Sequence, residues 1–227
     1  MNKIYDNLTN NGFADATLLF EPAIIEKLLD ALVVAGAFDY DKHLDIPLLS
    51  LSEVNVIAHF EQLLSLIKRY SGETMFPVKA FILDKTAESN WEIPWHQDLK
   101  IAVNQQLKVP EYINWSIEAG IPHVQPPVEV MEKLITLRIH LDPCDVGNAI
   151  HISPGSHKDG ILTMHQIQAL LKNIKPVIYT AAKDSIMLMK PLVLHYSPAS
   201  SSVHPRRILQ IEFGYDLDNG ITWHGLD

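Results

Sequence analysis

The stretch Ser185-Ile-Met-Leu-Met-Lys-Pro-Leu-Val-Leu-His195 carries the strongest fold signal in this chain of 227 residues. It is almost entirely apolar, and a short apolar run of this kind indicates a buried strand. The run ends at a histidine, so we expect His195 to lie at the end of a strand inside a sheet. A histidine in that position is a candidate metal ligand.

Further segments with strand character follow one another from residue 75 onward. They cover residues 75–83, 93–103, 134–141, 149–153 and 208–215. Turns and long excursions separate them, without regularly alternating helices, apart from one short helix expected over 163–173. This pattern favours a double-sheet antiparallel barrel, the jelly roll or double-stranded β-helix.

The first third of the chain predicts helices. Pro22 stands where a helix can begin, and apolar residues recur at helical spacing over 22–33. A second helix is expected over 52–69, where it ends in two basic residues. Together with the strands that follow, these helices predict an α+β fold.

We expect a single domain over residues 1–227, because a chain of this length can form one core. Its mostly helical N-terminal part, 1–72, is expected to pack on one sheet of a jelly-roll core, 73–216. Residues 105–127 show no clear period, and we interpret them as a long loop that forms either a lid and substrate wall or a purely structural excursion.

The composition excludes several classes of partner. The formal net charge is −9 and the pI about 5.6, so the chain repels nucleic acid backbones and anionic membrane surfaces. Cys144 is the only cysteine, which excludes a disulfide framework and fits a reducing cytoplasm. We find no signal peptide and no membrane helix, and we expect a cytoplasmic protein that acts on a small molecule.

Eleven histidines invite a search for a metal site. Non-haem Fe(II) oxygenases bind iron through two imidazoles and one carboxylate on one face of the metal. Side chains two residues apart in a strand point to the same face, so a His-x-Asp pair can supply two of these ligands. The sequence contains four such pairs, namely His43-Leu44-Asp45, His96-Gln97-Asp98, His140-Leu141-Asp142 and His157-Lys158-Asp159.

Context argues against three of the four pairs. His43 lies in a polar segment outside the strand region. His157 follows a Pro-Gly-Ser sequence, which indicates a surface turn, and too little chain separates it from His195 for the two to lie on opposed barrel strands. His140 lies within a strand, where a substrate-facing residue is conceivable but a hydrogen-bonded core histidine is the expected role.

The remaining pair differs in its surroundings. His96 follows Trp95 at a strand boundary, and about a hundred residues separate it from His195, which leaves room for the intervening strands. We therefore predict that His96, Asp98 and His195 bind the metal, and that Trp95 and Gln97 shape the shell around them.

The pair Arg206-Arg207 opens the last expected strand. 2-Oxoglutarate chelates iron through its keto and C1 carboxylate oxygens, and its far carboxylate then requires a bidentate cation. An arginine near the iron meets that requirement. Strand periodicity alone does not say which of the two arginines faces inward.

The chain resembles the phytanoyl-CoA dioxygenase family in motifs spread over roughly residues 75–215. These are Phe81-Ile-Leu-Asp-Lys85, Trp95-His-Gln-Asp98, Asn148 through Pro154-Gly-Ser-His157, and His195-Tyr-Ser197 through Arg206. In that family a serine follows the distal histidine by two residues and an arginine follows it by eleven, and Ser197 and Arg206 match both positions.

The resemblance implies an enzyme that uses Fe(II), 2-oxoglutarate and O2 and releases succinate and CO2. It implies that Arg206 and Ser197 bind 2-oxoglutarate, with Lys85 and Phe81 close to it. For Lys85 a solvated position at the strand end is the alternative. Asp98 matches the carboxylate ligand that halogenating relatives replace by a small residue, so the resemblance implies a hydroxylase. The chain departs from the family at Ala149 and Ser200.

Two alternatives remain. A cupin-like metal enzyme could use the same three ligands without 2-oxoglutarate and would not need the arginine. A non-catalytic jelly-roll binding protein would not consume 2-oxoglutarate at all. The sequence identifies neither the substrate nor the oligomeric state.

Overall fold

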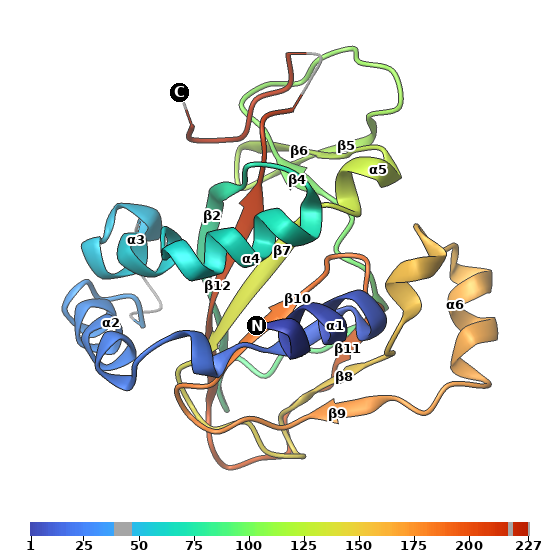
Figure 1. Ribbon diagram of the computed structural model, residues 1–227. Helices are drawn as coiled ribbons and strands as arrows, with labels where there is room; N and C mark the ends of the chain where they lie inside the picture. The colour runs from blue at the N-terminus through green and yellow to red at the C-terminus, as the bar shows by residue number, and fades with distance from the viewer. Residues whose placement is uncertain (39–46, 218–219, 227) are drawn as a thin grey trace.

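The computed structural model describes residues 1–38, 47–217 and 220–226 (Figure 1). The pair His43-Leu44-Asp45 therefore lies outside the described residues. None of the helices in the described ranges reaches the length and hydropathy of a membrane-spanning segment.

The described strands form three antiparallel sheets. The largest has the order β1-β10-β7-β12-β2, made by Phe13–Asp15, Ile186–Met189, Ile135–His140, Arg206–Gly214 and Phe76–Lys85. The second has the order β3-β11-β8-β9, made by Ile93–His96, His195–Ser197, Ile150–Ile152 and Val177–Tyr179. The third has the order β4-β6-β5, made by Ile101–Ala102, Ile121–Gln125 and Ile113–Glu118.

Four helices of the N-terminal part cover one face of the largest sheet (Figure 1). They are α1 (Asn2–Asn11), α2 (Pro22–Val34), α3 (Ser52–Ala58) and α4 (Glu61–Ser71). Helices α5 (Val128–Met131) and α6 (Met164–Leu171) lie later in the chain. The described residues also form short 3-10 turns over Thr17–Leu19, Leu48–Ser50 and Ser156–Asp159. The predicted α+β fold with helices packed on one sheet is confirmed, and closure of the sheets into a barrel stays a prediction.

Strand β12 shows how the largest sheet separates core from site. Leu209, Ile211 and Phe213 are buried among the N-terminal helices. Arg206, the first residue of the strand, and Gln210 point to the opposite face, because successive side chains of a strand alternate between faces. One face of the sheet therefore builds the core, and the other lines a pocket.

The stretch 185–194 is not one strand, as the sequence predicted. β10 ends at Met189, and His195 begins β11 in a different sheet. Pro191 has no N–H group for a ladder, and the Val193 N–H donates to the Lys190 carbonyl at 3.1 Å, which closes a turn. The chain thus crosses from one sheet to another just before His195.

The predicted helix over 52–69 is also divided. It consists of α3 and α4, because Phe60 is extended with φ −63 and ψ 121. Ile57 before the break and Leu63 after it are both fully buried. The break lets both helices turn their apolar faces to the same core.

Residues 105–127 contain a β-hairpin that the sequence analysis missed. β5 and β6 are joined at Ala119 and Gly120, whose φ values are 48 and 80. Two consecutive positive φ values are typical of a type I′ hairpin turn, and Asn-Gly is the usual sequence at these two positions. The Ala-Gly sequence gives a weaker signal.

The packing of the largest sheet against the helices predicts a strong effect on stability. Leu188 is fully buried on the helix-covered face, so Leu188→Ala should lower the free energy of unfolding by about 2–5 kcal/mol in a urea titration. Leu18 is 98% exposed, and the matched change Leu18→Ala should cost no more than about 0.5 kcal/mol. Equal losses in the two variants would contradict this assignment of the core.

Candidate metal centre

Two histidines from neighbouring strands face each other in the second sheet. His96 ends β3 and His195 begins β11, and the antiparallel register places them directly opposite, with ring centroids 4.2 Å apart. Asp98 follows β3, and its backbone N–H donates to the Pro191 carbonyl at 3.0 Å. The turn before His195 therefore also fixes the segment that carries Asp98.

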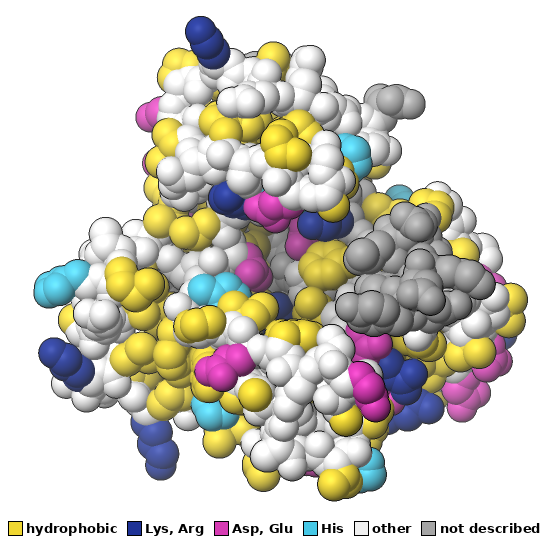
Figure 2. All heavy atoms as spheres, turned by 180° about the vertical axis from the view of Figure 1, so that it is seen from behind, with side chains coloured by type: hydrophobic (Ala, Val, Ile, Leu, Met, Phe, Trp, Pro, Cys, Tyr) yellow, Lys and Arg dark blue, Asp and Glu magenta, His cyan; other side chains and the backbone are white. Residues whose placement is uncertain are grey.

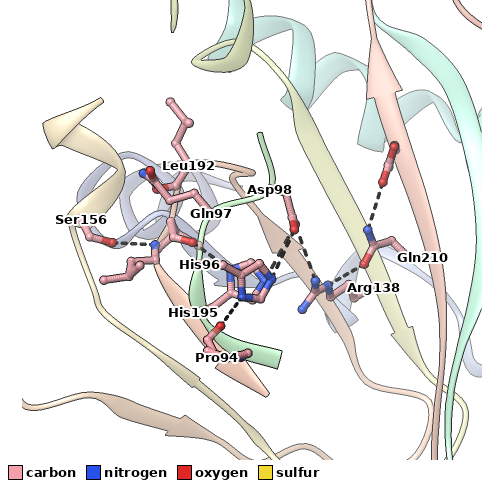
Figure 3. A network of polar contacts seen from close by, with 12 residues as sticks. Pro94, His96, Gln97, Asp98, Arg138, Ser156, Leu192, His195 and Gln210 are labelled. Atoms are coloured by element: carbon pink, nitrogen blue, oxygen red, sulfur yellow. Dashed lines mark hydrogen bonds and ion pairs between the residues drawn. The ribbon is translucent and has the colours of Figure 1, made fainter. Parts of the chain in front are cut away.

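The Asp98 carboxylate reaches both imidazoles (Figure 3). Its Oδ1 lies 3.6 Å from His96 Nε2, and its Oδ2 lies 3.8 Å from His195 Nε2. One ligand atom from each of the three residues can be chosen so that all lie within 4.8 Å of one another, and within the described ranges no other such group of His, Cys, Asp or Glu occurs. The three residues predicted from the sequence are brought together.

Both imidazoles are held in the orientation that metal binding requires. His96 Nδ1 lies 2.7 Å from the Pro94 carbonyl, and His195 Nδ1 lies 2.9 Å from the Val193 carbonyl. Because a carbonyl only accepts hydrogen bonds, each Nδ1 carries the proton. Each Nε2 then presents its lone pair to the space beside Asp98.

The charges at the centre suit a divalent cation. Burial lowers the pKa of His195 to about 4, so this imidazole is neutral near pH 7. Burial raises the pKa of the Asp98 carboxyl, but His195, His96 and Arg138 outweigh this effect and hold the pKa well below its usual range. Two imidazoles, one of them neutral by burial, and one ionised carboxylate form a complete ligand set for a metal of the iron type.

Arg138 supports the carboxylate from the largest sheet, and the sequence analysis missed it. Its Nη2 lies 4.0 Å from Asp98 Oδ2, and its Nε donates to Gln210 Oε1 at 2.9 Å (Figure 3). Gln210 Nε2 in turn donates to Glu212 Oε1 at 3.2 Å. The available signal was an arginine inside an otherwise apolar strand, where an unpaired charge is costly.

The Gln97 side chain fixes the segment that carries the ligands His96 and Asp98. Its Nε2 donates to the carbonyls of Gly160 at 2.8 Å and Leu192 at 2.7 Å, and its Oε1 accepts from the Leu162 N–H at 2.8 Å. Both amide N–H donors and the amide oxygen are therefore hydrogen-bonded in a buried site. The side chain of Trp95 stacks on Tyr196, with ring centroids 5.7 Å apart.

The three residues open into a pocket of about 490 Å³, which lies on the face of the largest sheet opposite the helices. Ser197 and Arg206 line the same pocket. Figure 2, drawn from behind, shows a hollow on this side of the molecule with basic and acidic side chains next to it. The pocket has the size of a typical small-molecule site.

Arg206 is only 1% exposed, and its guanidinium carbon lies 5.5 Å from the centre of the Trp91 ring. Its Nη2 donates to Ser197 Oγ at 3.0 Å, whereas Nε and Nη1 have no hydrogen-bond partner among the described residues. Burial lowers its pKa to about 10, which leaves it charged near pH 7. A buried cation with free donors is a site for an anion.

The neighbouring arginine faces the other way. Arg207 pairs with Asp142 through two contacts of 2.7 Å, from Nε to Oδ2 and from Nη2 to Oδ1. This bidentate pair satisfies the carboxylate of the third His-x-Asp pair. Its histidine, His140, is a buried core residue as expected, with Nδ1 3.2 Å from the Ser185 carbonyl.

The other predicted residues lie close to this end of the pocket. Lys85 is opposite Arg206 in the β2–β12 register and is 1% exposed. Its Nζ donates to Ser197 Oγ at 2.9 Å and to the Pro198 carbonyl, so it lies behind Ser197 and is not among the residues that line the pocket. Phe81 lines the pocket wall.

The sequence predicted a surface turn at His157, and this prediction is wrong. It is buried, and its Nε2 lies 3.2 Å from the Thr9 carbonyl. The Gly155 N–H donates to the Asn11 carbonyl at the end of α1. Helix α1, which the sequence analysis did not place, covers this turn.

The hairpin that replaces the expected loop contributes to the pocket. Glu118 and His123 line it, whereas the Gln125 side chain accepts a hydrogen bond from Asn114 at 2.8 Å. Trp115 donates to the Tyr112 carbonyl at 3.2 Å and belongs to a small apolar cluster. The excursion is a wall of the pocket built as a folded hairpin.

No protein-family model and no curated protein match the sequence, but solved structures share its fold. EctD from S. alaskensis, crystallised with 2-oxoglutarate and 5-hydroxyectoine, aligns at a TM-score of 0.67 with 16% identity over 93% of this chain and 74% of that one. SnoN, a non-heme alpha ketoglutarate dependent epimerase from nogalamycin biosynthesis, aligns at 0.61 with 13% identity over 100% and 91%.

EvdMO1 aligns at a TM-score of 0.66 with 16% identity over 94% of this chain, which spans 50% of that protein's length. At such identities the likeness establishes the fold. This chain therefore has the fold of structures that include non-haem, 2-oxoglutarate-dependent enzymes.

The geometry of the three ligands predicts which histidines a metal needs. In a Co(II) titration followed by visible absorbance, His96→Ala and His195→Ala should each abolish binding or nearly so, because each change removes one of three ligands. His165 is exposed on α6, and His165→Ala should bind Co(II) like the unmodified protein. If both histidine variants still bind Co(II) fully, the metal site lies elsewhere in the protein.

Proposed function

We propose that this protein is a non-haem Fe(II) oxygenase that uses 2-oxoglutarate and O2 to oxidise a small molecule. One observation carries the proposal: a His-Asp-His ligand set and a buried arginine with two unsatisfied donors line the same pocket. A metal enzyme that does not use a dicarboxylate has no need for that arginine. We place the protein with the phytanoyl-CoA dioxygenase family on the motifs that it shares.

His96, Asp98 and His195 would hold the iron, since two imidazoles and one carboxylate leave positions open for other ligands. When iron and 2-oxoglutarate are bound, they supply an oxidant from O2 and release succinate and CO2. Arg138 keeps the Asp98 carboxylate ionised and oriented from the far side, and Gln210 fixes Arg138.

Arg206 and Ser197 would bind the distal carboxylate of 2-oxoglutarate. The free Nε and Nη1 of Arg206 offer donors, and the Ser197 hydroxyl already accepts from Arg206 and Lys85, which leaves its proton for the carboxylate. Lys85 adds positive charge from behind Ser197. Phe81 and Leu83 form an apolar wall that keeps water away from the charged contacts.

The outcome of the oxidation follows from the carboxylate. Asp98 occupies one ligand position that a halogenating enzyme would leave to chloride, which favours hydroxylation. The epimerase among the structures with this fold shows that one fold serves several outcomes. The family name does not imply acyl-CoA as the substrate.

The two arginines provide a matched test of 2-oxoglutarate binding. Arg206→Ala should weaken 2-oxoglutarate binding to the anaerobic Fe(II) protein at least roughly thirtyfold, because truncating one partner of a desolvated charge pair costs about 2–5 kcal/mol. Arg207 pairs with Asp142 outside the pocket, so Arg207→Ala should stay within a few-fold of the unmodified protein. The metal-to-ligand charge-transfer absorbance reports both titrations.

If only Arg207→Ala weakens 2-oxoglutarate binding, Arg207 and not Arg206 binds the co-substrate, and this assignment is wrong. If neither variant weakens 2-oxoglutarate binding, the cupin-like alternative replaces this proposal.

The carboxylate ligand is tested by turnover. Asp98→Ala should eliminate succinate release by the Fe(II)-loaded protein in the presence of 2-oxoglutarate and O2, because the metal loses its negative ligand. Asp159 belongs to the fourth His-x-Asp pair and is exposed, and Asp159→Ala should keep normal turnover. Undiminished succinate release by Asp98→Ala would refute Asp98 as a ligand.

A further inference from the structure

Strand β12 runs along the pocket with two charged ends. Arg206 and Glu212 both line the pocket and are six residues apart on one face of the strand, a span of about 20 Å. Gln210 lies between them and is linked through Arg138 to Asp98. The metal centre is thus tied to the strand between these ends, and Glu212 lies on the side away from the 2-oxoglutarate site.

Glu212 is a half-buried carboxylate without a salt bridge among the described residues. It accepts a hydrogen bond from the neutral Gln210 amide at 3.2 Å. Burial raises the pKa of Glu212 and the Asp98 carboxylate adds to this effect, whereas Lys79 and Arg138 act in the opposite direction. A carboxylate in this setting is stabilised by any cation that enters the pocket.

Lys79 stands directly opposite Glu212 in the β2–β12 register and also lines the pocket. Its Nζ lies 5.0 Å from the centre of the Phe81 ring, and no carboxylate of the described residues lies within ion-pair distance of it. Directly opposed side chains in an antiparallel pair have Cβ atoms about 4.5–5.5 Å apart. The pocket therefore offers one cation and one anion side by side, which attract each other across the strands but form no direct ion pair among the described residues.

The second pair of charges at this end is already matched. Lys100 Nζ lies 3.6 Å from Glu118 Oε1, and both side chains line the pocket. Two lysines and two carboxylates give this end no net charge. A polyanion such as an acyl-CoA headgroup would meet as many negative as positive groups here.

We propose that Glu212 and Lys79 select a short zwitterionic substrate. This proposal rests on the function proposed above. Its ammonium or amine group lies against Glu212, and its carboxylate lies against Lys79. The cross-strand spacing of the two side chains suits a molecule whose opposite charges are separated by a few bonds, as in an amino acid. A substrate with one charge would be attracted by one of the two side chains and repelled by the other, which is unfavourable.

Matched probes test the charge preference. One set is L-pipecolate, piperidine, cyclohexanecarboxylate and cyclohexanecarboxamide, which share a six-membered ring; a second set uses the five-membered equivalents, beginning with L-proline. Binding to the Co(II) protein is measured by calorimetry, with and without 2-oxoglutarate, so that no turnover occurs. The zwitterion of at least one set should bind at least about tenfold more tightly than its three partners, since each charged contact contributes roughly a factor of ten.

Variants assign the preference to the two side chains. Glu212→Gln should weaken zwitterion binding at least about tenfold and remove its advantage over the anionic probe. Lys79→Gln should remove the advantage over the cationic probe. Glu118 is the matched control, because it is already paired with Lys100, and Glu118→Gln should change zwitterion binding by no more than about threefold.

Equal binding of the four charge classes, a preference for a neutral or singly charged probe, or an equal loss in Glu118→Gln and Glu212→Gln would overturn the proposal. Lys79→Gln should keep 2-oxoglutarate affinity within about threefold, since Lys79 lies away from Arg206. A protein that does not bind 2-oxoglutarate at all would defeat the proposed function instead, while the probe series without 2-oxoglutarate still measures the charge preference.

Discussion

The hydrogen bond from the Asp98 N–H to the Pro191 carbonyl joins two segments that are distant in the sequence. Pro191 lies in the turn that carries the chain from the largest sheet to the second sheet, and His195 follows that turn directly. Asp98 follows the strand that pairs with His195. One backbone contact between a loop and a turn therefore fixes two ligands together, and the β3–β11 register supplies the third.

Side chains alternate along β12, so one face of the largest sheet forms the apolar core and the other face lines the pocket. Leu209, Ile211 and Phe213 face the helices and are buried, whereas Arg206, Gln210 and Glu212 face the pocket. Buried charges are costly, so the largest sheet needs its apolar face to offset them. Precision at the site depends on this sheet, because arginine, amide and carboxylate all project from one rigid strand.

The site was easier to predict from the sequence than the fold around it. His96, Asp98 and His195 follow from residue types and spacing, which local strand geometry preserves. The break between α3 and α4, the hairpin in 105–127 and the burial of His157 under α1 depend on tertiary contacts, and the sequence analysis missed all three. Arg138 was missed for the same reason: its role appears only once β7 lies beside β12.

The hairpin of β5 and β6 pairs only with the two-residue strand β4 among the described strands, and its tip turns at Ala119 and Gly120. No strand of the two larger sheets is hydrogen-bonded to it. Because of this independence, the hairpin tip can lengthen, shorten or change composition during evolution. The backbone hydrogen bonds of the two larger sheets, which position the ligands, stay intact. New substrate ranges can therefore arise on one wall of the pocket without cost to the chemistry on the other.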